Sequence, residues 1–260
     1  MRRKIPGNVL CLSFALTMVM TMAFAGTGGA AWAEPQPLNT SIVKIGISLP
    51  TQREERWVLD KESFEKIAAS MGIEVAIQIA DYDAGRQQTQ CENLIIQGAT
   101  ALIVAPHDGE AAKNIVEIAH NAGVPVISND RLIMGADVDL HVTFDQFKIG
   151  YLMGDYIAKN LDSGNIVILK GDPRDNTTIP FREGAIAAIQ SKLDSGAFKI
   201  VAEQNCIDWQ PSAALRHMEQ ALTANNNEIQ GVIAQNDGIA GAVIQALAAV
   251  GLAGKVPVTG

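Results

Sequence analysis

Three polar residues, Asn129, Asp130 and Arg131, follow an apolar segment that reads as a buried strand, Val124 to Ser128. An acid beside a base at the end of such a strand fits either a surface turn with an ion pair or one wall of a binding site. This segment alone does not separate the two. Ligands of open parallel sheets bind beyond the carboxyl ends of the strands, so the other strand ends bear on the choice.

Similar polar side chains follow six predicted strands: Arg53 to Trp57; His107 and Asp108; Asn129 to Arg131; Asp172 and Arg174 to Asn176; Asp208 and Trp209; Asn236 and Asp237. Carboxylates accept hydrogen bonds from hydroxyl groups, Arg donates them, and Asn does both. The flat apolar face of Trp stacks on the C–H face of a sugar ring. We therefore predict two rims around a sugar-binding cleft, with Asp130 and Arg131 as a pair in which each keeps the other charged.

The elements that would position these residues alternate regularly. Short apolar strands and amphipathic helices follow one another from Lys44 to Gly260, which is typical of a parallel sheet covered on both faces. The pattern runs twice, with a boundary between residues 145 and 162. Neither unit contains GxGxxG, GxxxxGK[ST] or GxSxG, so the common nucleotide-binding and hydrolase readings lose their main support.

The first 33 residues have the pattern of a secretory signal: basic "MRRK", a long apolar run and the small-residue site "AWA". We expect cleavage after Ala33 and export to the periplasm, with an uncleaved membrane anchor as the alternative. The net charge of -8 argues against a nucleic-acid partner. Cys91 and Cys206 are expected to be buried and unpaired, and the scattered histidines do not support a metal site.

Several motifs resemble the sugar-binding proteins of ABC importers, in the type I periplasmic binding protein family, over Lys44 to Gly260. They are "ERW", "NDRLI" with "DVDLHVTFD", "GDPRDN", "DWQPSAALRHMEQALTANNN" and "AQND". The resemblance implies an α/β fold of two Rossmann-like lobes with parallel sheets, joined by a hinge. The N-terminal lobe would span residues 44–146 and the C-terminal lobe residues 147–260, after a linker at 34–43.

The resemblance also implies that the ligand is a monosaccharide, most readily D-xylose, and that the partner is a membrane permease. It further implies a monomer that has no catalytic residue, cofactor or metal. Arg56, Asp130 and Arg131 would contact the sugar from the first lobe, and Asp175 and Asn176 from the second. Trp209 would stack on the ring, Asn236 would bond a hydroxyl, and Asp237 would support it. Close relatives carry a second Asn where this chain has Thr177, which puts that contact in doubt.

Other conspicuous residues have ordinary structural interpretations. Trp57 is expected to pack inside a lobe, and Asp108 and Asp172 to cap turns. Glu54 and Glu55 are expected to be solvated acids that complement the dipole of the following helix.

Three other functions remain open. One is an exported α/β enzyme acting on sugars, with Asp130 and Asp237 as acid and base. Another is a binding protein for ribose, arabinose or glucose, or a chemoreceptor ligand domain. A repressor's ligand domain is disfavoured by the signal segment and by the lack of a helix-turn-helix before Lys44. The end at "VPVTG" suggests an incomplete second lobe and hinge, and hence a chain that binds sugar poorly.

Overall fold

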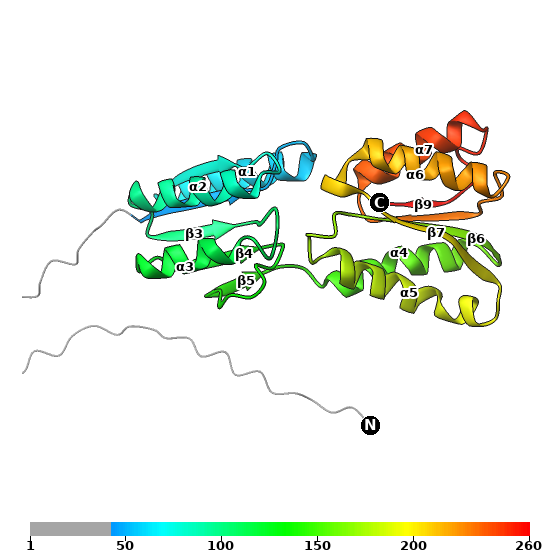
Figure 1. Ribbon diagram of the computed structural model, residues 1–260, viewed down its shortest axis with the longest axis horizontal. Helices are drawn as coiled ribbons and strands as arrows, with labels where there is room; N and C mark the ends of the chain where they lie inside the picture. Colours follow the sequence, from blue (N-terminus) through cyan, green and yellow to red (C-terminus); the bar gives the residue numbers. More distant parts are fainter. Residues whose placement is uncertain (1–42) are drawn as a thin grey trace, which may run out of the picture. The chain divides into compact units, whose positions relative to one another are not determined.

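The computed structural model describes residues 43–260 (Figure 1). The expected signal segment lies outside the described residues, as does the linker except for Val43. Within residues 43–260, no helix is both long enough and apolar enough to cross a membrane.

A five-stranded parallel sheet with strand order β2-β1-β3-β4-β5 forms the first lobe. Its elements are β1 (Lys44–Leu49), α1 (Glu55–Met71), β2 (Glu74–Ile79), α2 (Ala84–Ile96), β3 (Ala101–Val104), α3 (Lys113–Asn121), β4 (Val126–Asn129) and β5 (Leu140–Val142). Trp57 of α1 packs on one face of the sheet, whereas Leu94 of α2 and Ile115 of α3 pack on the other. Helices on both faces explain why the strands are apolar throughout.

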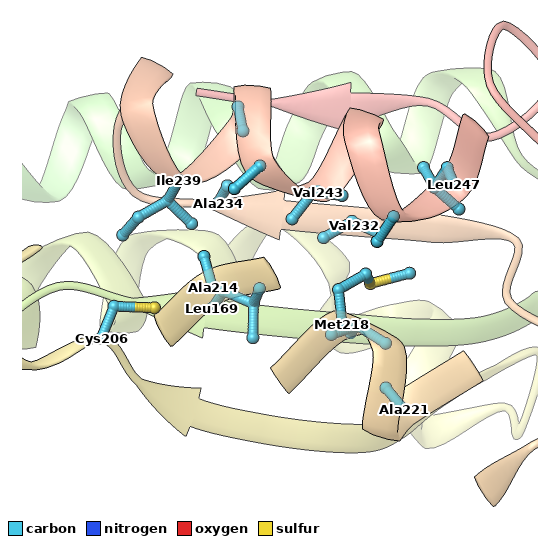
Figure 2. Packing of buried hydrophobic residues seen from close by; sticks show 14 of the residues in the cluster. Leu169, Cys206, Ala214, Met218, Ala221, Val232, Ala234, Ile239, Val243 and Leu247 are labelled. Atoms are coloured by element: carbon cyan, nitrogen blue, oxygen red, sulfur yellow. The ribbon is translucent and has the colours of Figure 1, made fainter. Parts of the chain in front are cut away.

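A four-stranded parallel sheet with strand order β7-β6-β8-β9 forms the second lobe. Its elements are α4 (Gln146–Asn160), β6 (Gly164–Lys170), α5 (Thr178–Asp194), β7 (Phe198–Asn205), the 3₁₀ turn Ile207–Trp209, α6 (Pro211–Ala224), β8 (Gly231–Ala234), α7 (Asp237–Ala249) and β9 (Val258–Thr259). Met218 of α6 and Val243 of α7 pack against Val232 on one face (Figure 2), and Ile157 of α4 and Ile189 of α5 cover the other.

Helices α4 and α5 touch backbone to backbone, because glycines lie at their crossing. A Cβ at Gly150 would lie 1.9 Å from the carbonyl oxygen of Phe181, and one at Gly184 would lie 2.0 Å from that of Phe147. No larger residue fits either position without separating the helices. This packing fixes the entry of the chain into the second lobe.

The predicted fold class is confirmed: the chain forms two Rossmann-like lobes, each an α/β unit with a parallel sheet. The predicted state of the cysteines is confirmed as well, since Cys91 and Cys206 are both buried and unpaired. Burial raises the pKa of each thiol to about 12. These two residues therefore serve as small core side chains.

Candidate functional site

Two adjoining cavities lie at the carboxyl ends of the strands. We call the cavity lined by the buried residues Arg131 and Asp175 the inner cavity; its volume is about 190 Å³. The other, lined by Arg53 and Gly238 among others, is the outer cavity, with a volume of about 410 Å³. Five residues line both: Glu54, Arg56, Trp209, Asn236 and Asp237. The inner cavity brings together all of the predicted site residues except Asn176: Arg56, Asp130, Arg131, Asp175, Trp209, Asn236 and Asp237.

Asp130 and Arg131 leave strand β4 in different directions. Asp130 has a left-handed backbone, with φ of 62°, and the N–H of Arg131 donates to the carbonyl of Asn129 over 2.7 Å. Asp130 Oδ2 pairs with Arg56 Nη1 at 3.2 Å, whereas Arg131 pairs with Asp175. The prediction of a direct Asp130–Arg131 pair is therefore wrong, because the tight turn separates the two side chains.

The pKa of Asp130 is raised above its ordinary value. Burial is the main cause, and the nearby charges of Arg56 and Arg131 only partly offset it. The backbone carbonyl of Asp130 accepts hydrogen bonds from the Thr143 hydroxyl at 2.8 Å and from Gln146 Nε2 at 3.1 Å. The segment that carries the chain from β5 into α4 is thus tied to the candidate site.

Arg131 and Asp175 form a buried ion pair between the lobes, with Arg131 Nε 2.7 Å from Asp175 Oδ2. The N–H of Nε is not aligned with that oxygen and has no hydrogen-bond partner among the described residues. Asp175 Oδ1 accepts from the Thr177 backbone N–H at 3.0 Å and from its hydroxyl at 2.7 Å. The hydroxyl of Thr177 is therefore used to hold Asp175.

Trp209 forms an aromatic wall of both cavities, and its side chain is fixed on two sides. The indole Nε1–H donates to Asp175 Oδ2 over 3.2 Å. The ring lies directly on Gly171, where an added Cβ would come within 2.2 Å of ring carbons. Only glycine allows the indole to lie flat on the strand end, so Gly171 and Asp175 together set the plane of the ring.

Of the remaining predicted site residues, Asn236 and Asp237 line the cavities and Asn176 does not. Asn236 caps helix α7, with its Oδ1 accepting from Ile239 N at 2.8 Å, which leaves its amide N–H₂ free to donate into the cavities. Asp237 is exposed and lines both cavities. Asn176 lines neither cavity, because its Oδ1 accepts from the backbone N–H of Leu132 at 2.8 Å.

The structural interpretation of three conspicuous residues is confirmed. Trp57 is buried in the first lobe, with Arg56 4.2 Å above its ring. Asp108 Oδ1 accepts from two backbone N–H groups of its own turn, at 2.9 and 3.0 Å. Asp172 binds the backbone and guanidinium of Arg174; burial opposes ionisation, but these hydrogen bonds outweigh it and the pKa of Asp172 is lowered.

The expectation for Glu54 is wrong. Its side chain is only 17% exposed. Its Oε1 accepts from the Tyr82 hydroxyl and from Arg53 Nη2, the latter at 3.3 Å, while its Oε2 is buried without a hydrogen-bond partner among the described residues. Sequence reasoning missed Tyr82 because it follows strand β2, whose end was not counted as part of the rim.

Comparisons with known proteins agree with this geometry. Residues 45–260 match the family described as periplasmic binding protein domain. The chain is 40% identical over 218 residues to the D-xylose-binding periplasmic proteins of Escherichia coli and Haemophilus influenzae, covering 84% of this chain in each case. It spans 66% of the length of these two relatives.

Solved structures of sugar- and polyol-binding proteins share the fold. A solute-binding protein from Actinobacillus succinogenes with bound D-allose matches with a TM-score of 0.76 and 29% identity, over 84% of this chain and 78% of that one. The Caulobacter myo-inositol-binding protein matches with a TM-score of 0.75 and 28% identity, over 84% and 74%. The resemblance inferred from the motifs is therefore confirmed, and the chain belongs to the periplasmic binding protein family.

Proposed function

We propose that this chain is a non-catalytic solute-binding protein that captures a monosaccharide, D-xylose first among the candidates. We also propose that it is exported to the periplasm after cleavage at Ala33 and passes the sugar to the membrane permease of an ABC importer. Its lobes would span residues 44–146 and 147–260, and it would act as a monomer.

The observation that carries the proposal is the lining of the inner cavity. Trp209 offers a flat apolar surface, whereas Arg56, Asp130, Arg131 and Asn236 offer charged and amide groups around it. An aromatic plane combined with convergent polar groups suits a small polyhydroxylated ring.

The relatives support D-xylose and also keep other sugars open. Two curated relatives are D-xylose-binding periplasmic proteins, while a multiple sugar-binding receptor of Rhizobium radiobacter is 31% identical and a ribose import binding protein of Bacillus subtilis is 32% identical. The choice of sugar therefore needs a direct comparison among pentoses and hexoses.

The test is a thermal-shift titration with xylose, ribose, arabinose and glucose of the chain extended to the length of the relatives of which it spans 66%, followed by recovery of the bound sugar. A ligand that binds only the native state raises the melting temperature by an amount that grows with the logarithm of its concentration divided by its Kd. We expect the largest shift with xylose and recovery of the unaltered sugar by NMR. Conversion of the sugar would instead support an enzyme that uses Asp130 and Asp237, and no shift with any sugar would contradict the proposal.

A further inference from the structure

Three side chains of the first lobe gather where the second lobe presents Asp208. Arg53, Tyr82 and His107 come from the loops after β1, β2 and β3, and we call them the docking pad. The Arg53 guanidinium lies 4.2 Å above the Tyr82 ring, and the edge of that ring meets the His107 ring with centroids 5.3 Å apart. None of the three belongs to the predicted set of sugar contacts.

The docking pad is arranged in advance by contacts within its own lobe. Glu54 Oε1 accepts from both the Tyr82 hydroxyl and Arg53 Nη2. The backbone N–H of Arg53 donates to the Thr51 hydroxyl over 3.0 Å. A long Arg side chain loses conformational freedom when it binds, and these contacts reduce that loss.

The partner of the docking pad is the turn of residues 206–210, which carries Trp209 and which we call the Trp209 turn. Asp208 and Trp209 have positive φ values of 52° and 54°. Two consecutive non-glycine residues in the left-handed region need support from their surroundings. Within the second lobe, Asp208 N donates to Asp172 Oδ2 at 2.5 Å, and Asp208 Oδ1 pairs with Arg174 Nη2 at 2.5 Å.

The rest of the support for Asp208 comes from the first lobe. Arg53 Nη2 donates to the backbone carbonyl of Asp208, and His107 Nε2 lies 4.0 Å from its Oδ1. Nearby, the N–H of Gly109 donates to the carbonyl of Arg174 over 3.2 Å. All three contacts require the two lobes to be together. Those of Arg53 and His107 reach Asp208, the residue that directly precedes Trp209.

We infer that Arg53, Tyr82 and His107 are positioning residues that dock the Trp209 turn on the first lobe and thereby hold the indole against the sugar when the cleft is closed. The consequence for binding rests on the proposed function, whereas the docking itself does not. Docking restrains the Trp209 turn whether or not a sugar is bound, and when a sugar is bound the loss of docking speeds its release.

The first measurement needs no sugar. Hydrogen exchange of the ligand-free full chain is followed in peptides that cover residues 206–210, for the wild type, Arg53→Ala, Arg53→Lys and Arg86→Ala. Arg86 forms an exposed ion pair with Asp81 and serves as the matched control. We expect faster exchange in the Trp209 turn only for Arg53→Ala, with most of the protection restored by Arg53→Lys, which keeps a donor and a charge. Unchanged exchange in Arg53→Ala overturns the inference.

The second measurement follows sugar release and association by stopped-flow fluorescence with the best sugar of the thermal-shift series. Arg53→Ala removes a hydrogen bond from a charged donor, so release should be about tenfold faster or more. Equal release rates for Arg53→Ala and wild type overturn the effect on binding. If the wild type binds no sugar while exchange still increases in Arg53→Ala, docking stands and the proposed function fails.

Discussion

Arg131 Nε lies 2.7 Å from Asp175 Oδ2, and this ion pair joins the two lobes at the wall of the inner cavity. Both side chains are almost fully buried, at 6% and 1% exposed. Asp175 also holds the Trp209 indole through its Nε1–H. A single carboxylate thus links the guanidinium of one lobe to the aromatic wall of the other.

Replacing Arg131 by Ala should weaken sugar binding by about 2–5 kcal/mol, because Asp175 is left as a buried charge without its cation and the sugar loses a donor. Isothermal calorimetry of the purified variant measures the change. Arg86→Ala, which removes only an exposed pair with Asp81, should bind like the wild type. Equal affinities for Arg131→Ala and Arg86→Ala would contradict the assigned role of Arg131.

Replacing Gly171 by Ala should displace the indole, since the added Cβ would come within 2.2 Å of Trp209 ring carbons. We expect sugar affinity to fall at least about tenfold, or about 1.4 kcal/mol, while the fold persists. The matched control is Gly241→Ala in helix α7, where nothing lies within 4 Å of the added Cβ. That control should be neutral or more stable by about 0.5–1 kcal/mol, because Ala favours the helix. Wild-type affinity in Gly171→Ala would show that the ring plane is not set by Gly171.

Replacing Gly150 by Ala should destabilise the second lobe at a point that borders the inner cavity, since Ile149 and Phe181 line it. The added Cβ would lie 1.9 Å from the Phe181 carbonyl oxygen, so helices α4 and α5 must separate. Urea unfolding should show a loss of about 1–3 kcal/mol, the usual cost of overpacking. An unfolding midpoint equal to that of wild type would mean that the close helix contact contributes little.

Protonation of His107 should destabilise the native state in mildly acidic solution. Its pKa is lowered first by burial and then by the charges of Arg174 and Arg131, against the opposing effect of Asp208 and Asp172. Because the native state lowers this pKa, the unfolded chain takes up a proton first as the pH falls below about 6.5. Stability should therefore be complete above that pH and decrease below it. Urea unfolding of wild type and His107→Gln between pH 5 and 7.5 tests this, and parallel pH profiles would contradict it.

The sequence was most informative where the periodicity and the strand ends were considered together. The alternation of apolar strands and amphipathic helices predicts both sheets, and the bounds expected for helix α6, Pro211 to Ala224, match the structure. Proline opens that helix and an asparagine-rich turn ends it. The prediction that polar residues at strand ends gather together also agrees with the structure, since the carboxyl ends of parallel strands share one edge.

Pairing between particular side chains could not be predicted in the same way. Adjacency in sequence suggested that Asp130 pairs with Arg131, but the left-handed backbone at Asp130 directs it to Arg56 instead. Glu54 was expected to be a solvated acid at a helix start, yet its carboxylate accepts a hydrogen bond from the hydroxyl of Tyr82, 28 residues later, and is largely buried. Asn176 follows Asp175 directly but points at the Leu132 backbone. Each of these contacts depends on the relative placement of separate loops, which local patterns do not encode.

The most direct test of the central claim is calorimetric titration of D-xylose into the wild-type chain and into Trp209→Ala, with the sugar analysed by NMR afterwards. In a chain extended to the length of the relatives of which it spans 66%, we expect saturable one-to-one binding of unaltered xylose to the wild type. We also expect a loss of at least about 1.4 kcal/mol, or tenfold in affinity, for Trp209→Ala. Binding of equal strength in both proteins would contradict the placement of the sugar on Trp209, and the absence of heat with the wild type would contradict xylose as the ligand.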